Sequence, residues 1–359
     1  MRKFIFAAPA IALGVALGAP YAAAASSAAK VIVVGPGQSI QAAVDQAQPG
    51  DTVLVKPGVY HQAVLIRTDG ITLRGSGDFR NGTVIEPPSA PPNNLCTGIF
   101  GPTGVCIVAK KVNMKTGAVK TPVYNDTVTG LYVSGFAGNG VFGYGTYGLT
   151  VQRVVAVNDG AYGISRFEST KTLFANDTAI GNSEAGFYVG DSPNAATVVR
   201  DDVAMGNSLG IFIRHARGVT VVHNRSTGNC QGILVLDDGQ PGGAGNALVQ
   251  SNSVFRNNKS CPASEDAPAL QGGGILLVGA TQTKVMQNSV QGNRGQQFNS
   301  GGIVVVSAAV FHGSDPEFVT IARNTAYGDK PSDLRWDGTG SVSFAGNHCK
   351  TSVPAGNCH

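Results

Sequence analysis

Four segments in the middle of the chain begin with glycine and continue with alternating apolar residues: Gly163-Ile-Ser-Arg166, Gly186-Phe-Tyr-Val189, Gly210-Ile-Phe-Ile213 and Gly232-Ile-Leu-Val235. The unit also occurs at Gly140, Gly274 and Gly302, and the first five glycines stand 23, 23, 24 and 22 residues apart. Alternation with a period of two predicts β-strands, and a return every ~23 residues predicts one coil of a β-solenoid. A sandwich or a propeller does not explain such a period.

A second repeating unit ends in asparagine. It recurs at Thr172–Asn176, Thr220–Asn224, Leu248–Asn252, Lys284–Asn288, Thr320–Asn324 and Ser343–Asn347, and Asp201 replaces asparagine in Thr197–Asp201. A Gly-Asn pair follows at Asn182, Asn207, Asn229 and Asn293. Asparagine suits a corner because it tolerates the left-handed backbone, and stacked asparagines can hydrogen-bond into a ladder.

The composition excludes several classes of protein. Glycine accounts for 49 of 359 residues and charged residues for only 13%, against about 7% and 25% in typical domains. A coiled coil, a helical bundle and a charge-rich disordered chain are therefore excluded. The formal net charge is +4 without a basic run, so nucleic acid is not expected as a partner.

The N-terminus has the pattern of an export signal. Arg2 and Lys3 precede an apolar segment, and Ala23-Ala24-Ala25 offers small residues for cleavage before Ser26. We expect residues 1–25 to be a signal peptide and the mature chain to be secreted or periplasmic. No later apolar run reaches the ~20 residues of a membrane span.

The six cysteines fit an exported protein with disulfides. Six cysteines allow 15 connectivities, and their clustering favours neighbours: Cys96–Cys106, Cys230–Cys261 and Cys349–Cys358, the last closing a tail over residues 349–358. A zinc site is not expected, because no Cys-x-x-Cys motif is present and the spacings are irregular.

The repeats, together with Gly37–Asp45, Pro49-Gly50-Asp51, Lys56–Tyr60 and Gly70–Gly75, resemble the secreted right-handed parallel β-helix proteins, the pectate-lyase-like superfamily with its short β-helix repeats. The resemblance implies an all-β chain with one single-stranded right-handed parallel β-helix domain over residues 26–359. Residues 37–50 would form an N-terminal capping helix region, whose apolar residues fall on one helix face. The superfamily holds lyases, hydrolases, epimerases and non-enzymes, so it leaves the activity open.

Four titratable residues share one position in the repeat. Counted five residues from each initiating glycine, they are Glu168, Asp191, His215 and Asp237; we call them the column. Coils repeat at about 4.8 Å, so Asp191 and Asp237 are expected ~9.6 Å apart with His215 between them. Arg166, Arg214, Arg217 and Asp238 lie close to the column in sequence.

Loop insertions flank this strand, at residues 86–125, 237–246 and 307–316, and would wall a groove. Tyr188 and Phe212 point outward as its floor, and Arg166, Arg214 and Arg217 could hold uronate carboxylates. We therefore predict a secreted, monomeric, polysaccharide-active protein with these five residues as its substrate-binding set.

Two reactions and two non-catalytic alternatives remain open. Inverting hydrolysis would use Asp191 and Asp237, with Asp238 and His215 beside them. β-Elimination would use His215 or an arginine as the base, with Ca²⁺ as a candidate cofactor on Glu168, Asp191 and Asp237. The alternatives are a carbohydrate-binding or surface β-helix protein without activity, and a column that is a structural ladder of ion pairs.

Overall fold

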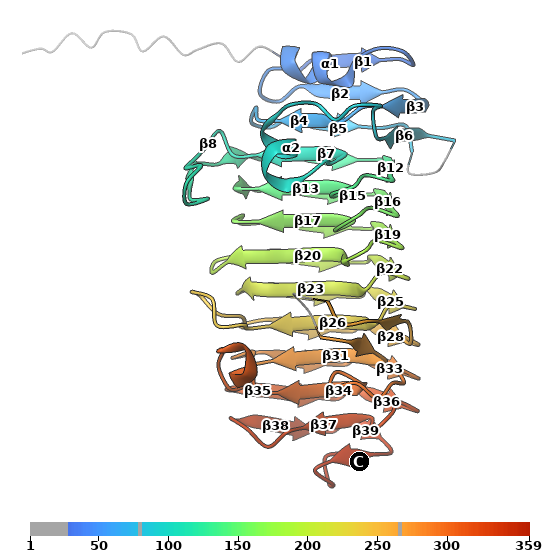
Figure 1. Ribbon diagram of the computed structural model, residues 1–359, viewed down its shortest axis with the longest axis vertical. Coiled ribbons are helices and arrows are strands. Elements are labelled where there is room, and N and C mark those ends of the chain that lie inside the picture. The colour runs from blue at the N-terminus through green and yellow to red at the C-terminus, as the bar shows by residue number, and fades with distance from the viewer. Residues whose placement is uncertain (1–27, 78–80, 265–267) are drawn as a thin grey trace, which may run out of the picture.

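The computed structural model describes residues 28–77, 81–264 and 268–359, which form an elongated stack of β-strand coils (Figure 1). The expected signal peptide, residues 1–25, lies outside the described residues. One coil consists of β18 (Leu173–Ala175), β19 (Thr178–Ile180) and β20 (Ala185–Ser192). Each of these strands pairs in parallel with its equivalents one coil earlier and one coil later. The described chain is therefore a single-stranded parallel β-helix, as the repeat predicts.

Three long parallel sheets run along the stack. The first sheet contains, in spatial order, β1 (Val31–Val34), β2 (Thr52–Val55), β5 (Thr72–Arg74), β11 (Thr127–Thr129), β15 (Thr150–Gln152), β18, β21 (Thr197–Arg200), β24 (Val219–Val222), β27 (Leu248–Gln250), β32 (Lys284–Met286), β35 (Val319–Ala322) and β38 (Val342–Ala345). The second contains β3 (Gly58–His61), β6 (Thr83–Glu86), β12 (Tyr132–Ser134), β16 (Val155–Val157), β19, β22 (Val203–Met205), β25 (Arg225–Thr227), β28 (Ser253–Phe255), β33 (Ser289–Gln291), β36 (Thr325–Tyr327) and β39 (His348–Cys349). The third contains β4 (Val64–Ile66), β7 (Val105–Val108), β13 (Val141–Tyr144), β17 (Ile164–Phe167), β20, β23 (Leu209–Ala216), β26 (Gln231–Leu236), β31 (Gly273–Val278), β34 (Gly301–Val306), β37 (Leu334–Trp336) and β40 (Ser352–Val353).

The inward side chains of these sheets form one continuous apolar core. In the third sheet the residues one and three places after each glycine point inward, as in Ile211, Ile213, Ile233 and Val235, which are buried in it. The periodicity of two thus places apolar residues inside every coil and leaves the outer face for loops and ligands.

A short helix lies at the N-terminal end of the stack (Figure 1). Helix α1 (Ile40–Gln46) is capped at its N-terminus by Ser39, whose side chain accepts the backbone N–H of Ala42. Ile40, Ala43 and Val44 are buried against the first strands of the core. The helix is shorter than the 37–50 region expected from the sequence.

Two rows of buried amides and carboxylates stabilise the corners of the coils. In each row a side-chain oxygen accepts the backbone N–H of the equivalent residue one coil earlier. The first row runs through Asp177, Asp202, Asn224, Asn252, Asn288, Asn324 and Asn347. The second runs through Asp159, Asn182, Asn207, Asn229, Asn257, Asn293 and Asp329. These rows satisfy N–H groups that would otherwise be buried without a partner.

The aspartates in these rows make the fold sensitive to pH. Burial raises the pKa of Asp159 to about 8, although the backbone N–H groups of Phe136 and Gly135 oppose the shift. Burial likewise raises to about 7 the pKa of Asp329, in the second row, and that of Asp126, whose carboxylate accepts the backbone N–H of Ile71 outside the two rows. A carboxyl whose folded pKa lies above its unfolded value of about 3.9 stabilises the fold at low pH, and this stability is lost as the pH rises through the folded pKa.

We therefore expect Asp159→Asn to raise the melting temperature at pH 8 and to leave it nearly unchanged at pH 4. The Oδ2 atom of Asp159 is buried without a hydrogen-bond partner, whereas the asparagines of the row donate from the equivalent position, as Asn207 does to the carbonyl of Ala179. Thermal unfolding at the two pH values measures the effect. A lower melting temperature of the variant at pH 8 would contradict this prediction, because it would show that the carboxylate stabilises the row more than an amide does.

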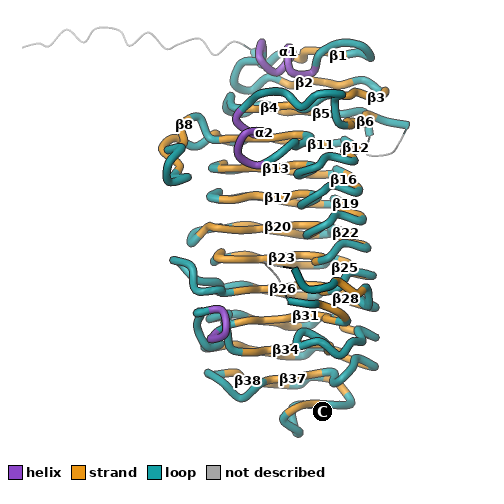
Figure 2. The backbone as a smooth tube through the Cα atoms, viewed as in Figure 1, coloured by secondary structure: helices purple, strands orange, loops and turns teal. Residues whose placement is uncertain are grey.

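Insertions cover the outer face of the third sheet at two levels (Figure 2). Helix α2 (Leu95–Phe100) and the hairpin of β8 (Lys111–Val112) and β9 (Val119–Thr121) belong to the 86–125 insertion, and Tyr144 packs against this cover. The 3₁₀ helix η1 (Ala309–Phe311) covers β26, β31 and β34. Smaller pairs are β10 (Val123–Tyr124) with β14 (Thr146–Tyr147), and β29 (Ser260–Cys261) with β30 (Leu270–Gln271).

The cysteines form three disulfides in the structure, Cys96–Cys106, Cys230–Cys261 and Cys349–Cys358. The first ties α2 to β7, so it anchors the N-terminal cover, and the last closes the C-terminal tail. No helix within the described residues has the length and apolar character needed to cross a membrane.

Candidate functional site

The column lies at the ends of four neighbouring strands of the third sheet, β17, β20, β23 and β26. The register pairs Phe167 with Gly190 and Gly190 with Arg214, so Glu168, Asp191 and His215 follow at equivalent places on successive coils. These three residues have left-handed φ values of 48°, 49° and 48°. At the same position in other coils, Gly145 and Gly279 have φ values of 64° and 63°. Glu168 directly follows the last residue of β17, and Asp191 and His215 are the next-to-last residues of β20 and β23, so the left-handed residue lies where each strand gives way to the turn.

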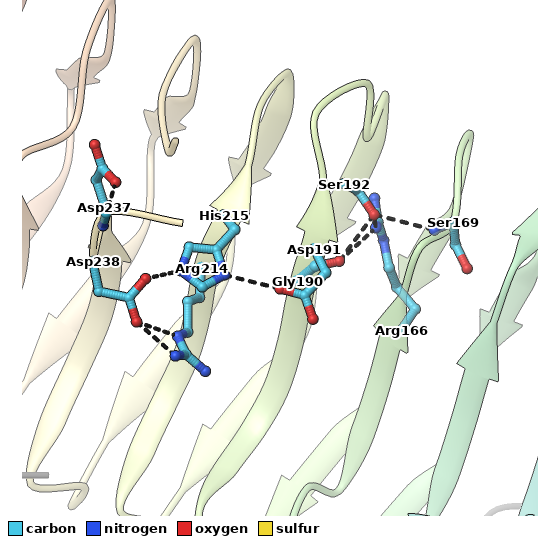
Figure 3. Close-up of polar contacts among 10 residues, drawn as sticks. Arg166, Ser169, Gly190, Asp191, Ser192, Arg214, His215, Asp237 and Asp238 are labelled. Atoms are coloured by element: carbon cyan, nitrogen blue, oxygen red, sulfur yellow. Dashed lines mark hydrogen bonds and ion pairs between the residues drawn. The ribbon is translucent and has the colours of Figure 1, made fainter. Parts of the chain in front are cut away.

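His215 is held between two carboxylates (Figure 3). Its Nδ1 lies 2.9 Å from Oδ1 of Asp191, and its Nε2 contacts Oδ1 of Asp238. The histidine side chain is only 5% exposed, whereas that of Asp191 is 38% exposed. The ring is therefore fixed in orientation, and it can donate to both carboxylates only when it carries its second proton.

Asp238 joins His215 to an exposed arginine (Figure 3). Nε and Nη2 of Arg214 lie 2.8 and 2.6 Å from Oδ2 of Asp238, whose other oxygen faces the histidine. Burial lowers the pKa of Arg214, but the hydrogen bond and charge of Asp238 outweigh it, so the net effect is a raised pKa. The Arg214 side chain is 38% exposed, so a permanent positive charge reaches the surface beside the histidine.

Arg214, Asp238, His215 and Asp191 form one cluster of contacts, which we call the cluster. Asp237 is not part of it, contrary to the expected pairing of Asp237 with Asp191. It is 4% exposed, its Oδ1 accepts the N–H of Gly239 at 3.0 Å, and its Oδ2 accepts that of Ser314 at 3.3 Å. The carboxylate thus ties the 237–246 loop to the 307–316 loop. Asp238 occupies the position beside His215 instead.

Asp237→Asn is therefore expected to lower stability rather than to abolish activity. The amide would turn a donor toward one of two N–H groups that the carboxylate now accepts, at a cost of about 1–3 kcal/mol. Denaturant unfolding measures the loss, and hydrogen exchange should show the 307–316 loop opening first. An unchanged midpoint combined with lost turnover would contradict this assignment.

Arg166 also differs from expectation, because it does not reach the surface. It is 0% exposed and points inward from β17, three residues after Gly163. Nε and Nη2 lie 3.2 and 2.6 Å from Oγ1 of Thr197, and Nη1 donates to the carbonyl of Gly190. A polysaccharide on the outer face cannot contact this guanidinium.

Arg217 lies in the turn from β23 to β24, two residues after His215, but its side chain does not join the cluster. Its Nη1 and Nη2 donate to Thr281 Oγ1 at 2.9 Å and to Gln282 Oε1 at 2.7 Å. The guanidinium therefore links its own coil to a later one, and these donors are not free to bind a substrate carboxylate.

The aromatic floor is larger than the sequence indicated. Tyr188 stacks on both Tyr162 and Phe167 with ring centroids 4.5 Å apart, and it meets Phe212 edge-on at 5.2 Å. Tyr188 is 1% exposed, and its own partners cover it, so Phe212 is the more accessible ring. The sequence pattern did not identify Tyr162 and Phe167 as part of the floor. Phe167 could have been found, because it stands four residues after Gly163, where side chains also point outward.

The charges around Tyr188 connect the floor to the cluster. Burial raises the pKa of the Tyr188 hydroxyl, the charge of Asp191 adds to the effect, and Arg214 opposes it. Burial, followed by repulsion from Asp191, also raises the pKa of Glu168, and Arg166 opposes this shift. Glu168 therefore lies within the same electrostatic field, one coil from Asp191.

The residues suggested for Ca²⁺ do not fit a calcium site. Both oxygens of Asp237 accept backbone N–H groups within the loops, and Asp191 is bonded to His215. Among the described residues no group of three histidine, cysteine, aspartate or glutamate side chains is arranged to hold a metal ion.

The cluster lies between the two covers along the stack. A pocket of about 200 Å³ lies under the N-terminal cover beside Leu95 and Tyr144, and a hollow of about 470 Å³ lies beside Phe318 and Trp336 near the C-terminal end. Strands β17, β20 and β23 lie between the level of α2 and the level of η1 along the stack (Figure 1).

Comparison with protein families supports this architecture. The model described as "Right handed beta helix region" matches residues 139–348. The chain belongs to this right-handed β-helix family. The match includes every residue of the column and both ladders of asparagine, and it fixes the hand of the coil. No curated protein matches the sequence.

Solved structures of this right-handed β-helix architecture include three informative neighbours. The A-module of the mannuronan C-5 epimerase AlgE6 of Azotobacter vinelandii aligns with a TM-score of 0.62 and 20% identity, over 86% of this chain and 88% of that one. The AlgE4 A-module of the same organism gives 0.56 and 18%, over 87% and 94%. The periplasmic alginate epimerase AlgG gives 0.54 and 14%, over 88% and 83%. At these identities the likeness concerns the fold.

Proposed function

We propose that this protein acts on a uronate-containing polysaccharide and transfers the proton at C5, the carbon that bears the carboxylate. The observation that carries the proposal is the chain Arg214–Asp238–His215–Asp191. It places a partly exposed carboxylate-binding cation beside an imidazole ring, whose nitrogens can accept or donate a proton. Hydrolysis is less well supported, since Asp237 is not available as the second carboxylate.

The first step follows from the charges. A uronate carboxylate binds Arg214 and competes with Asp238 for the guanidinium. Asp238 then leaves Nε2 of His215, which is free to act as a base when it is neutral, while Asp191 keeps the ring oriented through Nδ1. The C5–H bond breaks, the proton moves to Nε2, and the electron pair enters the carboxylate as an enediolate whose charge Arg214 stabilises.

The enediolate has two outcomes. A solvent proton delivered to the opposite face of C5 gives the epimer and leaves the abstracted proton on His215 to return to solvent. Departure of the C4 oxygen, which takes up that proton, gives an unsaturated sugar and a shorter chain. The two epimerase neighbours from Azotobacter are named for C5 chemistry on mannuronan, which supports epimerisation as the first reaction to test. Three disulfides also fit an exported protein in an oxidising compartment, as we propose.

The purified protein should be incubated in D₂O with mannuronan, polygalacturonate and a neutral glucan. We expect deuterium at C5 of a uronate polymer, followed by NMR, and no change in the glucan. Ultraviolet absorbance of unsaturated ends would identify elimination, and reducing ends without absorbance would identify hydrolysis and contradict the proposal. Binding without exchange would indicate a carbohydrate-binding protein instead.

A further inference from the structure

Among the described residues, Arg166 has the largest side chain that is fully buried. The ion pairs found among the described residues do not include it. At the same inward position, neighbouring coils carry Gly143, Val189, Ile213 and Val235. A single guanidinium therefore interrupts an apolar row in the interior of the β-helix.

Stability does not explain this arginine. Burial lowers the pKa of Arg166 to about 9, and the charges of Asp191 and Glu168 only partly oppose the shift. A buried ionic group is often no more stable than an apolar residue of similar size. Residues that cost stability commonly serve the site that they support.

The contacts of Arg166 converge on the turn that carries Asp191 (Figure 3). Nη1 lies 3.3 Å from the carbonyl oxygen of Gly190 and also contacts Oγ of Ser192, the residues before and after Asp191. Ser192 Oγ is itself fixed, because it donates to Gly190 O at 2.9 Å and accepts the N–H of Ser169 at 3.1 Å. Thr197 holds the other side of the guanidinium.

We propose that Arg166 is a positioning residue for the Asp191–His215 pair. It holds the left-handed turn at Asp191 from inside the coil, so that the carboxylate faces Nδ1 of His215 on the next coil. It also places a positive charge behind Asp191 and Glu168, which stabilises their negative charge at the surface. The catalytic consequence rests on the proposed function, whereas the structural consequence can be measured without substrate.

The test variant is Arg166→Met, which keeps much of the volume and removes the charge and the five donors. The proton on Nδ1 of His215, held by Asp191, should give a low-field NMR line that is absent from His215→Asn. We expect this line to disappear in Arg166→Met while the melting temperature stays equal or rises. With a uronate polymer, kcat should fall about 10²-fold with KM nearly unchanged, since a displacement near 1 Å costs about that much.

Two further variants define the comparison. Ser192→Ala removes the hydroxyl that Arg166 binds beside Asp191, and it should weaken the same line; it replaces the methionine variant if that variant does not fold. Ser169→Ala, at the same interior corner one coil earlier, is the control and should retain the line.

The outcomes separate this proposal from the proposed function. A parent spectrum without the line, or a line and kcat unchanged in Arg166→Met, overturns the role of Arg166. If the parent processes no uronate polymer but the line behaves as expected, the positioning role stands and the proposed reaction fails. If the parent is active and the line persists in the variant, the reaction stands and the positioning role fails.

Discussion

His215→Asn is expected to reduce C5 exchange by about 10²–10⁴-fold, the usual effect of losing an acid–base group. Asparagine can still donate to one carboxylate, but it has no nitrogen that takes up a proton near neutral pH. The buried position between Asp191 and Asp238 should remain occupied, so the fold should persist. Deuterium incorporation per unit time measures the effect, and circular dichroism checks the fold.

The matched control for this prediction is His223→Asn. His223 lies on another corner of the coil, and its side chain is 62% exposed, so exchange should equal that of the parent. Arg214→Lys completes the series, because lysine keeps the charge but loses the fork that binds a carboxylate. We expect a higher KM for the polymer in this variant. Full activity in His215→Asn would disprove the assignment of the base.

Asn252→Ala is expected to produce the largest loss of stability, about 3–5 kcal/mol from several buried polar groups that lose partners. Nδ2 of Asn252 donates to Val221 O and to Asn288 Oδ1, both at 2.9 Å. Its Oδ1 accepts from the backbone N–H of Asn224 at 2.9 Å and from Nδ2 of Asn224 at 3.0 Å. Denaturant unfolding gives the change in free energy.

Asn258→Ala serves as the control for the ladder. Asn258 is exposed and bonds only at the surface, to the carbonyl of Gly292 and the N–H of Arg294. Its loss should stay within about 0.5 kcal/mol, as for most surface changes. Equal losses in the two variants would show that the buried row is not what stabilises the corner.

The sequence predicted the coil, its period and the shared position of the column, because these follow from the alternation of apolar residues and from glycine spacing. For two coils, the sequence pattern assigned the first ladder to a residue one position too early. Asn176 and Asp201 take left-handed φ values of 59° and 58° at the corner, and the next residues, Asp177 and Asp202, enter the ladder. Both corners carry two polar residues in a row, so the pattern alone did not show which one is buried.

The candidate site was less predictable than the fold. Arg166 lies near the column in sequence, and this suggested a substrate-binding role. The alternation of inward and outward side chains, however, places a residue three positions after the glycine inside the coil, and Arg166 follows this rule. Asp237 and Asp238 are adjacent, and only the path of the loop decides which one turns toward His215. Loop geometry of this kind depends on contacts far along the chain, here with Ser314.

The two partners of the candidate pair come from adjacent coils that are in strict register. Each coil contacts mainly its immediate neighbours. Evolution or an engineer could therefore lengthen or shorten this chain by whole coils beyond β17 and β26 without moving Asp191 relative to His215. One coil added between β20 and β23 would separate them by about 4.8 Å more. The geometry of the site is local in space, and it tolerates changes in the length of the rod that carries it.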